Sequence, residues 1–197
     1  MKLHLPTLAL TFAFLLPNHV YAQSSSKVIS ANQYGNVSVK QNSKATSNWY
    51  KYTAKDGSYT ILHPQAPQEE ATDVMGIKAV FVVSEDAKGR GYMSNSTKLP
   101  LTNIDTSLFD TELLYNYTLD NLTKKSNAVI VSQQNITFNG FPGKEAIIHF
   151  KNDKYFAKVR FFLNPKNAMM YQVMIASADN NFNFPEATAF IDSLTIK

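Results

Sequence analysis

The second half of the chain alternates apolar and polar residues with a period of two. This period is typical of β-strands, because successive side chains of a strand point to opposite faces. The segments that show it are residues 128–131, 145–150, 155–163 and 169–175. The connections at residues 152–153 and 164–167 are too short for a parallel crossover, which needs a dozen or more residues. The pattern therefore predicts successive antiparallel strands.

The domain's first two apolar segments flank a turn signal. Residues 49–52 and 59–63 lie on either side of Asp56-Gly57, a dipeptide that favours hairpin turns. We therefore predict a strand pair here.

Prolines interrupt the pattern after this pair. Pro64 and Pro67 predict a loop, because proline lacks the backbone donor that a strand ladder needs. Beyond it, residues 75–83 are rich in Val, Ile and Phe and predict a buried strand, and residues 90–97 form a weaker strand candidate.

The period changes to that of a helix over residues 107–125. Ser107 followed by Asp110 resembles a capping box, and Lys124 and Lys125 suit the negative end of a helix dipole. Two adjoining apolar faces contain Leu108, Tyr115, Leu119 and Leu122, and Phe109, Leu113 and Tyr117. This pattern predicts a long amphipathic helix that covers the sheet.

A second helix is expected near the C-terminus. Pro185 suits a first helical position, and the apolar residues behind it recur at helical spacing. They are Ala187, Phe190, Ile191 and Leu194. An antiparallel sheet with one long and one terminal helix predicts an α+β domain.

The segment Gly140-Phe141-Pro142-Gly143 begins and ends with glycine. Its spacing matches neither a phosphate-binding loop nor a dinucleotide fingerprint. We interpret it as a tight turn before Glu145 in which both glycines adopt positive φ.

The N-terminal residues are typical of export. Lys2, the apolar run at 8–16 and the small residue Ala22 predict a secretory signal peptide over residues 1–22. Residues 23–48 are rich in Ser, Asn, Gln and Lys and predict a flexible polar linker. The domain then covers residues 49–197. We expect a periplasmic or secreted monomer, without a lipid anchor because the chain has no cysteine, and without a membrane span.

Charge excludes one class of function. Four of the 19 Lys and Arg residues precede residue 49, which leaves 15 basic residues against 15 acidic ones in the domain. A neutral domain lacks the basic surface that nucleic-acid binding requires. The chain has no cysteine, so neither disulfides nor thiolate metal ligands contribute. About 150 residues can bury enough surface to fold without them.

Two histidines of the domain, His63 and His149, are the candidates for acid–base or metal chemistry. Glu145 and His149 share a strand face but lie about 13 Å apart along it, too far to share a metal ion without further ligands. No nucleophile motif accompanies either histidine. We therefore predict no catalytic, cofactor-binding or metal-binding residues, and no cofactor.

Aromatic residues give the one indication of a binding surface. They are frequent at the domain start and in residues 155–162. A sheet only partly covered by helices would leave an apolar patch open to a partner or ligand, whereas full coverage would make these residues core. The candidate residues are Trp49, Tyr52, Phe109, Phe162 and Tyr171.

The order of these elements and several short segments resemble the PsbP-like family, in particular its exported bacterial members, over residues 49–197. The segments are Tyr59-Thr60-Ile61-Leu62-His63-Pro64, the Gly140–Gly143 turn, Arg160, Tyr171-Gln172 and Phe190-Ile191-Asp192-Ser193. The resemblance implies an α/β/α sandwich around a central antiparallel sheet. It also implies a mainly non-catalytic accessory or partner-binding role. The photosystem role does not carry over, because the photosystem-docking and metal-binding residues of the photosynthetic members do not map onto this sequence.

Three functional hypotheses follow from these observations. The first is an exported accessory module that binds a protein partner. The second is a carrier of a small apolar ligand between sheet and helix, which a pocket lined by Phe162, Tyr171 or Phe109 would favour and a filled core would oppose. The third is a hydrolase, which requires His63 or His149 to meet a carboxylate or hydroxyl in a cleft.

Overall fold

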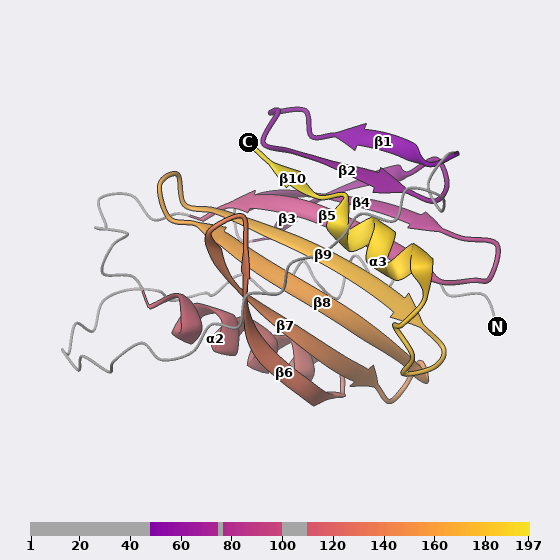
Figure 1. Ribbon diagram of the computed structural model, residues 1–197. Helices are drawn as coiled ribbons and strands as arrows, with labels where there is room; N and C mark the ends of the chain where they lie inside the picture. The colour runs from indigo at the N-terminus through magenta and orange to yellow at the C-terminus, as the bar shows by residue number, and fades with distance from the viewer. Residues whose placement is uncertain (1–47, 75–76, 100–109) are drawn as a thin grey trace.

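The computed structural model describes residues 48–74, 77–99 and 110–197. The predicted signal peptide and nearly all of the predicted linker lie outside these residues. The main sheet contains seven antiparallel strands in the order β3-β4-β5-β9-β8-β7-β6 (Figure 1). Their bounds are β3 (Gln68–Val74), β4 (Ile77–Glu85), β5 (Gly91–Lys98), β6 (Ala128–Phe138), β7 (Phe141–Phe150), β8 (Tyr155–Asn164) and β9 (Met169–Ser177).

A small second sheet joins the beginning and the end of the domain. It has the order β1-β2-β10, with β1 (Tyr50–Thr53), β2 (Tyr59–His63) and β10 (Thr195–Ile196). The predicted β1–β2 hairpin is confirmed, and Gly57 adopts φ +71° in its turn. We did not predict β10, whose two residues pair with β2 opposite Tyr59 and Thr60.

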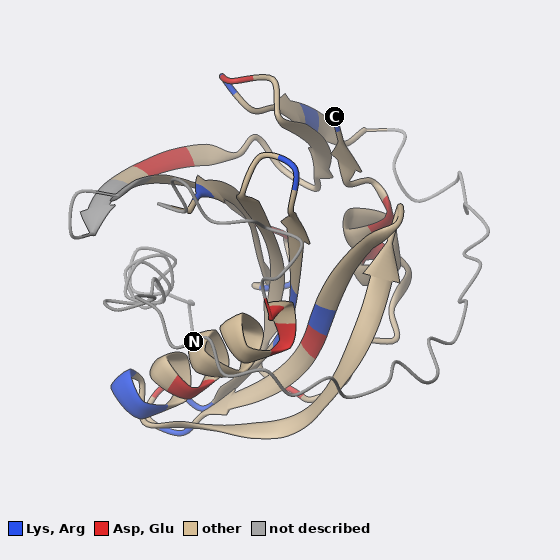
Figure 2. Ribbon diagram, turned by 90° about the vertical axis from the view of Figure 1, so that its left-hand side faces the viewer, with Lys and Arg blue, Asp and Glu red and all other residues tan. Residues whose placement is uncertain are grey.

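The helices lie on opposite faces of the main sheet. Helix α2 (Thr111–Lys125) packs on β6 and β7, whereas α3 (Pro185–Asp192) and the small sheet lie on the other side (Figures 1 and 2). This arrangement confirms the predicted α+β fold with a central antiparallel sheet between helices. None of the helices in the described part of the chain is long and apolar enough to cross a membrane.

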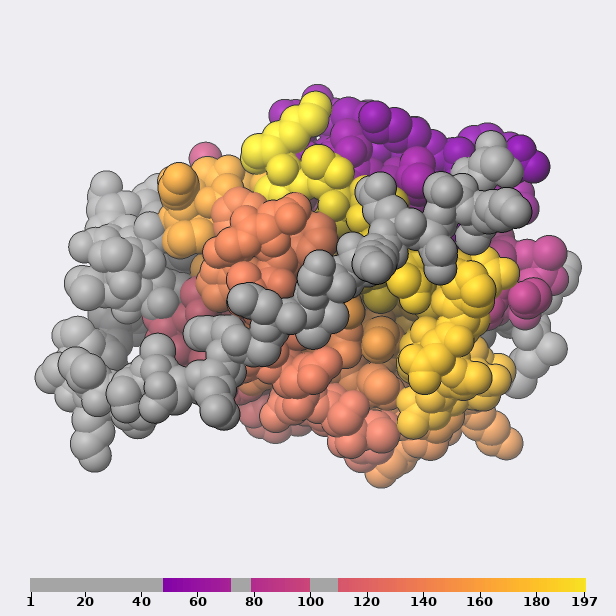
Figure 3. Space-filling model, viewed as in Figure 1, coloured from indigo at the N-terminus to yellow at the C-terminus, as the bar shows by residue number. Residues whose placement is uncertain are grey.

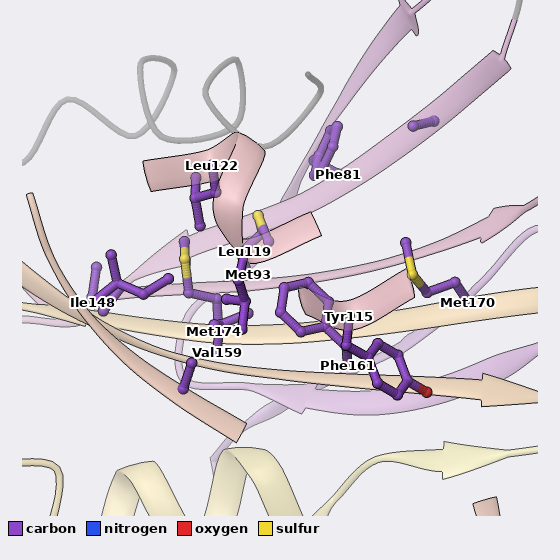
Figure 4. Packing of buried hydrophobic residues seen from close by; sticks show 14 of the residues in the cluster. Phe81, Met93, Tyr115, Leu119, Leu122, Ile148, Val159, Phe161, Met170 and Met174 are labelled. Carbon is purple, nitrogen blue, oxygen red and sulfur yellow. The ribbon is translucent and has the colours of Figure 1, made fainter. Parts of the chain in front are cut away.

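The core beneath α2 consists of closely packed apolar side chains. Tyr115 and Leu119 of the helix meet strand residues such as Phe161 and Met174 (Figure 4). The rings of Tyr115 and Phe161 stack with centroids 6.3 Å apart. The buried Tyr115, Leu119 and Leu122 confirm one predicted helix face. Leu113 and Tyr117, from the adjoining face, are 67% and 39% exposed.

The N-terminus of α2 lies later than predicted. Asp110 caps it, because its carboxylate accepts a hydrogen bond from the Leu113 amide at 3.0 Å. An aspartate can provide this acceptor alone. Ser107, Leu108 and Phe109 lie outside the described residues.

The core on the α3 side joins the two sheets. The predicted stripe of the terminal helix is confirmed, because Ala187, Phe190 and Ile191 are buried, and so is Leu194 just after the helix. The Phe190 ring packs edge-on against Tyr92 of β5, with 5.2 Å between centroids. This helix therefore covers the β5 region, away from β6.

Two local predictions were wrong. The segment after Pro67 forms edge strand β3 rather than only a loop. The tight turn consists of Asn139 and Gly140, both at positive φ, while Gly143 lies inside β7. A Cβ on Gly143 would lie 2.5 Å from the Phe161 carbonyl oxygen, so this glycine allows close packing instead of a special φ.

Candidate functional site

His63 lies inside the protein, between β2 and the main sheet. Its side chain is fully buried, and its Nδ1 lies 2.9 Å from Ser84 Oγ. Its Nε2 lies 3.3 Å from Ser94 Oγ, which also lies 3.3 Å from the Tyr59 hydroxyl. Burial lowers the pKa of His63 to about 3. The imidazole is therefore neutral at physiological pH and satisfied by hydroxyl groups.

These contacts favour a structural role for His63. A general base must reach the proton that it removes from substrate, and this ring is enclosed by Tyr52, Phe190 and two serines. The hydroxyls required by the hydrolase hypothesis are present, but the ring is inaccessible from solvent.

His149 and Glu145 occupy the same face of β7 but have different partners. The His149 ring stacks on Phe156 with centroids 4.4 Å apart. Glu145 accepts hydrogen bonds from Gln134 at 2.9 Å and from Arg160 at 2.6 Å. Among the described residues, no group of three or more His, Cys, Asp or Glu could hold a metal ion.

Glu145 is the centre of a charged group on the α3 side of the sheet. Its carboxylate contacts Arg160 Nε, and Lys158 Nζ lies 3.5 Å away. Burial would raise the pKa of Glu145, but the charges of Arg160 and Lys158 and the hydrogen bonds lower it. Two cations therefore face one buried carboxylate on β7 and β8.

The aromatic candidates Trp49 and Tyr52 are half-buried beside the small sheet. The Trp49 ring lies edge-on to Tyr92, with centroids 6.3 Å apart, and the Tyr52 hydroxyl donates to Glu69 at 3.0 Å. Both side chains pack on the α3-side core.

Phe162 and Tyr171 lie deeper in the same core and are 0% and 1% exposed. Phe162 packs against Phe138 and Tyr171 against Tyr59, with centroids 4.9 and 6.2 Å apart. This packing favours a filled core over a ligand pocket. Phe109 lies outside the described residues, so the five candidates are not brought together as one surface.

An exposed apolar surface lies instead at β6. The two helices cover different ends of the sheet, so α3 does not reach the part formed by β6, β7 and the first half of β8 (Figure 1). There Val129 and Val131 are 38% and 47% exposed. Strand pairing places Val129 opposite His149, and His149 opposite Phe156. We define Val129, Val131, Ile147, His149 and Phe156 as the β6 surface.

Atoms of β8 reach the exterior between β6 and β7 on one side and the C-terminal segment on the other (Figure 3). Ile147, His149 and Phe156 are only half-buried. The charged side chains of Lys158 and Arg160 lie on the same face, since strand pairing sets Lys158 opposite Ile147. The surface thus combines apolar side chains with neighbouring cations.

Lysines cluster at the end of the sheet where β6 begins. The turn after α2 contacts the β7–β8 turn, because Asn127 Nδ2 donates to Asn152 Oδ1 at 2.8 Å. We define Lys124, Lys125, Lys151 and Lys154 as the lysine cluster; all four are exposed, and the end of α2 is basic in Figure 2. The nearest acidic residues in sequence are Asp153 in the same turn and Asp120 one turn back on α2.

Sequence reasoning missed the β6 surface. The alternation of Val129 and Val131 predicted a strand, but nothing local showed that this strand forms the edge of the sheet. One signal was present in the sequence, because residues 126–138 contain no charged residue and no proline.

No protein-family model matches the chain, and no curated protein sequence matches it. Among solved structures, it is similar to the solution structure of cyanobacterial PsbP (CyanoP) from Synechocystis sp. PCC 6803. The TM-score is 0.54 at 11% identity, over 81% of this chain and 98% of that one. The Ran-binding protein Mog1p of Saccharomyces cerevisiae gives a TM-score of 0.47 at 9% identity, over 76% and 95% of the two chains. The similarity to CyanoP shows that the chain has a PsbP-like fold.

Proposed function

We propose that the protein is an exported, non-catalytic accessory module that binds a protein partner through the β6 surface. The observation that carries this proposal is the exposure of Val129 and Val131 on a strand at the edge of the sheet. Exposed apolar groups rimmed by polar residues mark interaction sites on soluble proteins.

The surface has the composition of an interface. Aromatic and aliphatic side chains, among them Phe156 and Ile147, supply apolar area that a partner can bury. Lys158 and Arg160 beside them can orient a partner through its charged groups. The two cations share Glu145, and Arg160 also interacts with Asp192, so they are held in fixed positions from which they could donate hydrogen bonds to a partner.

The two other hypotheses have less support. A carrier needs an enclosed space, whereas Phe162 and Tyr171 are packed against other rings. A hydrolase needs an accessible base, whereas His63 is buried among hydroxyls. The export signal predicted at residues 1–22 supports a partner in the cell envelope or outside the cell.

Site-specific cross-linking tests the proposal. A photoactivatable amino acid replaces Val131 in one variant and the equally apolar, more exposed Leu113 of α2 in a control, and each is irradiated in the host's envelope fraction. We expect one protein to cross-link reproducibly from position 131 and not from position 113. An excess of the wild-type protein without the photoactivatable residue should abolish this cross-link. Equal yields from both positions would contradict binding at the β6 surface.

A further inference from the structure

We infer that β6 receives an extended segment of the partner as an eighth strand, antiparallel to β6, whose acidic C-terminal end lies against the lysine cluster. This inference rests on the proposed function and specifies its mode of binding. Strand addition uses main-chain hydrogen bonds for affinity and alternate side chains for specificity.

The first observation is that β6 is a long edge strand of the described sheet. It has eleven residues, Ala128–Phe138, and pairs only with β7 among the described strands. Natural edge strands are usually short or carry charges, prolines or bulges that hinder pairing. β6 contains neither charge nor proline, and its one bulge, at Val131, leaves Ser132–Phe138 in regular pairing with β7.

The opposite edge of the same sheet shows the usual protection. β3 has seven residues with the sequence QEEATDV, three of them acidic. The contrast is informative because both edge strands present unpaired backbone groups that can pair with another chain. One edge is blocked by charge, and the other is left able to pair.

The side chains in the middle of β6 are accessible on both faces. Residues 131–135 are exposed without interruption, although neighbouring residues of a strand point to opposite faces. An added strand would therefore contact Ser132 and Gln134 on one face and Gln133 and Asn135 on the other. Uncharged amides and hydroxyls suit an uncharged partner strand.

Charge sets the direction of the added strand. The lysine cluster lies where β6 begins, so an antiparallel segment ends there. Its C-terminal carboxylate or acidic side chains would meet four lysines and Asp153. Antiparallel addition continues the pairing found throughout this sheet.

A second copy of this chain fits less well. In an antiparallel β6–β6 pair, each lysine cluster would lie beside the other copy's β6–β7 turn. That turn and the strand ends beside it, residues 137–143, contain no acidic residue. A partner that brings acidic groups complements both the uncharged edge and the exposed lysine cluster.

Synthetic peptides test the inference on the protein as purified from its host. The probe is a nonapeptide of three Thr-Val repeats followed by Asp-Glu-Asp, and the controls carry the acidic residues first or replace them with lysines. Two further probes are N-methylated at odd or at even residues of the repeat. Because an edge strand bonds only alternate amides, we expect one N-methylated series to lose binding and the other to retain it.

Protein variants locate the site. K151E/K154E should weaken binding of the acidic probe about tenfold, because it replaces two exposed attractive charge pairs with repulsive ones. K51E/K166E, at exposed lysines elsewhere, should leave the affinity unchanged. Amide exchange measured by NMR should slow in β6 when the probe binds. Equal loss with both N-methylated series, or protection outside β6, would overturn strand addition.

The outcomes separate this inference from the proposed function. A cross-link at Val131 together with no slowing of β6 exchange would leave the partner-binding role and remove the strand mode. Protection of β6 that depends on protein concentration without peptide would assign the edge to a second copy and overturn the inferred occupant.

Discussion

At the residue scale, several side chains are explained by the space or polarity around them rather than by chemistry. His63 was a candidate base by type, but its environment makes it a neutral hydrogen-bonding residue. Gly143 was expected to adopt a positive φ, but the fold requires glycine there because a side chain would overlap Phe161 and Phe162. Both cases depend on neighbours distant in sequence, which explains why residue identity alone did not predict them.

His63 should make stability depend on pH. Its pKa is about 3 in the folded protein and about 6.5 when unfolded. The contribution of neutral His63 to the free energy of unfolding is therefore complete above pH 6.5. It is lost as the pH falls towards 3, by about 1.4 kcal/mol per pH unit. Urea unfolding of the wild type and H63Q at several pH values measures this. We expect the difference between their unfolding free energies to be constant above about pH 7.5. Below about pH 6.5 it should change with a slope that corresponds to the uptake of one proton. Parallel curves would contradict a buried neutral His63.

Gly143→Ala should destabilise the protein by about 1–3 kcal/mol, because the new Cβ would overlap the Phe161 carbonyl oxygen and the Phe162 ring. Gly140→Asn is the matched control. Gly140 has positive φ, which Asn tolerates, and a Cβ at this position would have no other group within 4 Å. Thermal unfolding should separate the two variants, and an equal effect would mean that packing at Gly143 is not limiting.

At the element scale, one ion-paired residue connects the β4–β5 hairpin with α3. Arg90 binds Asp86 through Nε at 2.6 Å, lies 3.9 Å above the Phe184 ring and reaches Glu186 at 3.4 Å. Asp86 also accepts hydrogen bonds from the Tyr92 hydroxyl and two backbone amides. The terminal helix is thus fixed at its N-terminal end by a hairpin that lies far away in the sequence.

Asp86→Ala should therefore cost about 2–4 kcal/mol of unfolding free energy, because it leaves Arg90 without its buried partner. Lys88→Ala is the control, since Lys88 pairs with the same Glu186 but is 68% exposed. We expect it to cost less than about 1 kcal/mol. Chemical denaturation of both variants tests the anchor, and similar costs would argue against it.

The elements that sequence predicted well are those with a clear local period. The strands from β7 to β9 and helix α2 have long apolar repeats, and their order followed from short connections. β3 was missed because Glu69, Glu70 and the two prolines before them resemble a loop, although charged residues are common on an edge strand. β10 was missed because its two residues are held by pairing with Thr60 and Tyr59, a contact of long range.

At the scale of the whole molecule, the offset of the two helices determines which part of the sheet they leave uncovered. α2 packs on β6 and β7, whereas α3 packs near β5. Within the described residues, one end of the sheet consequently keeps an exposed face and an edge strand paired on one side only. The sequence revealed the apolar residues of that surface but not their position, since strand order is a property of the assembled sheet.

The most direct test of partner binding at β6 is the affinity of the captured partner for charge variants of the surface. Calorimetry with V129K/V131K should show binding at least about tenfold weaker than the wild type, because two lysines would be buried against the partner. Leu113→Lys, on the far side of the sheet, should bind as the wild type does. Unchanged affinity of V129K/V131K, with its fold intact by circular dichroism, would contradict partner binding at β6.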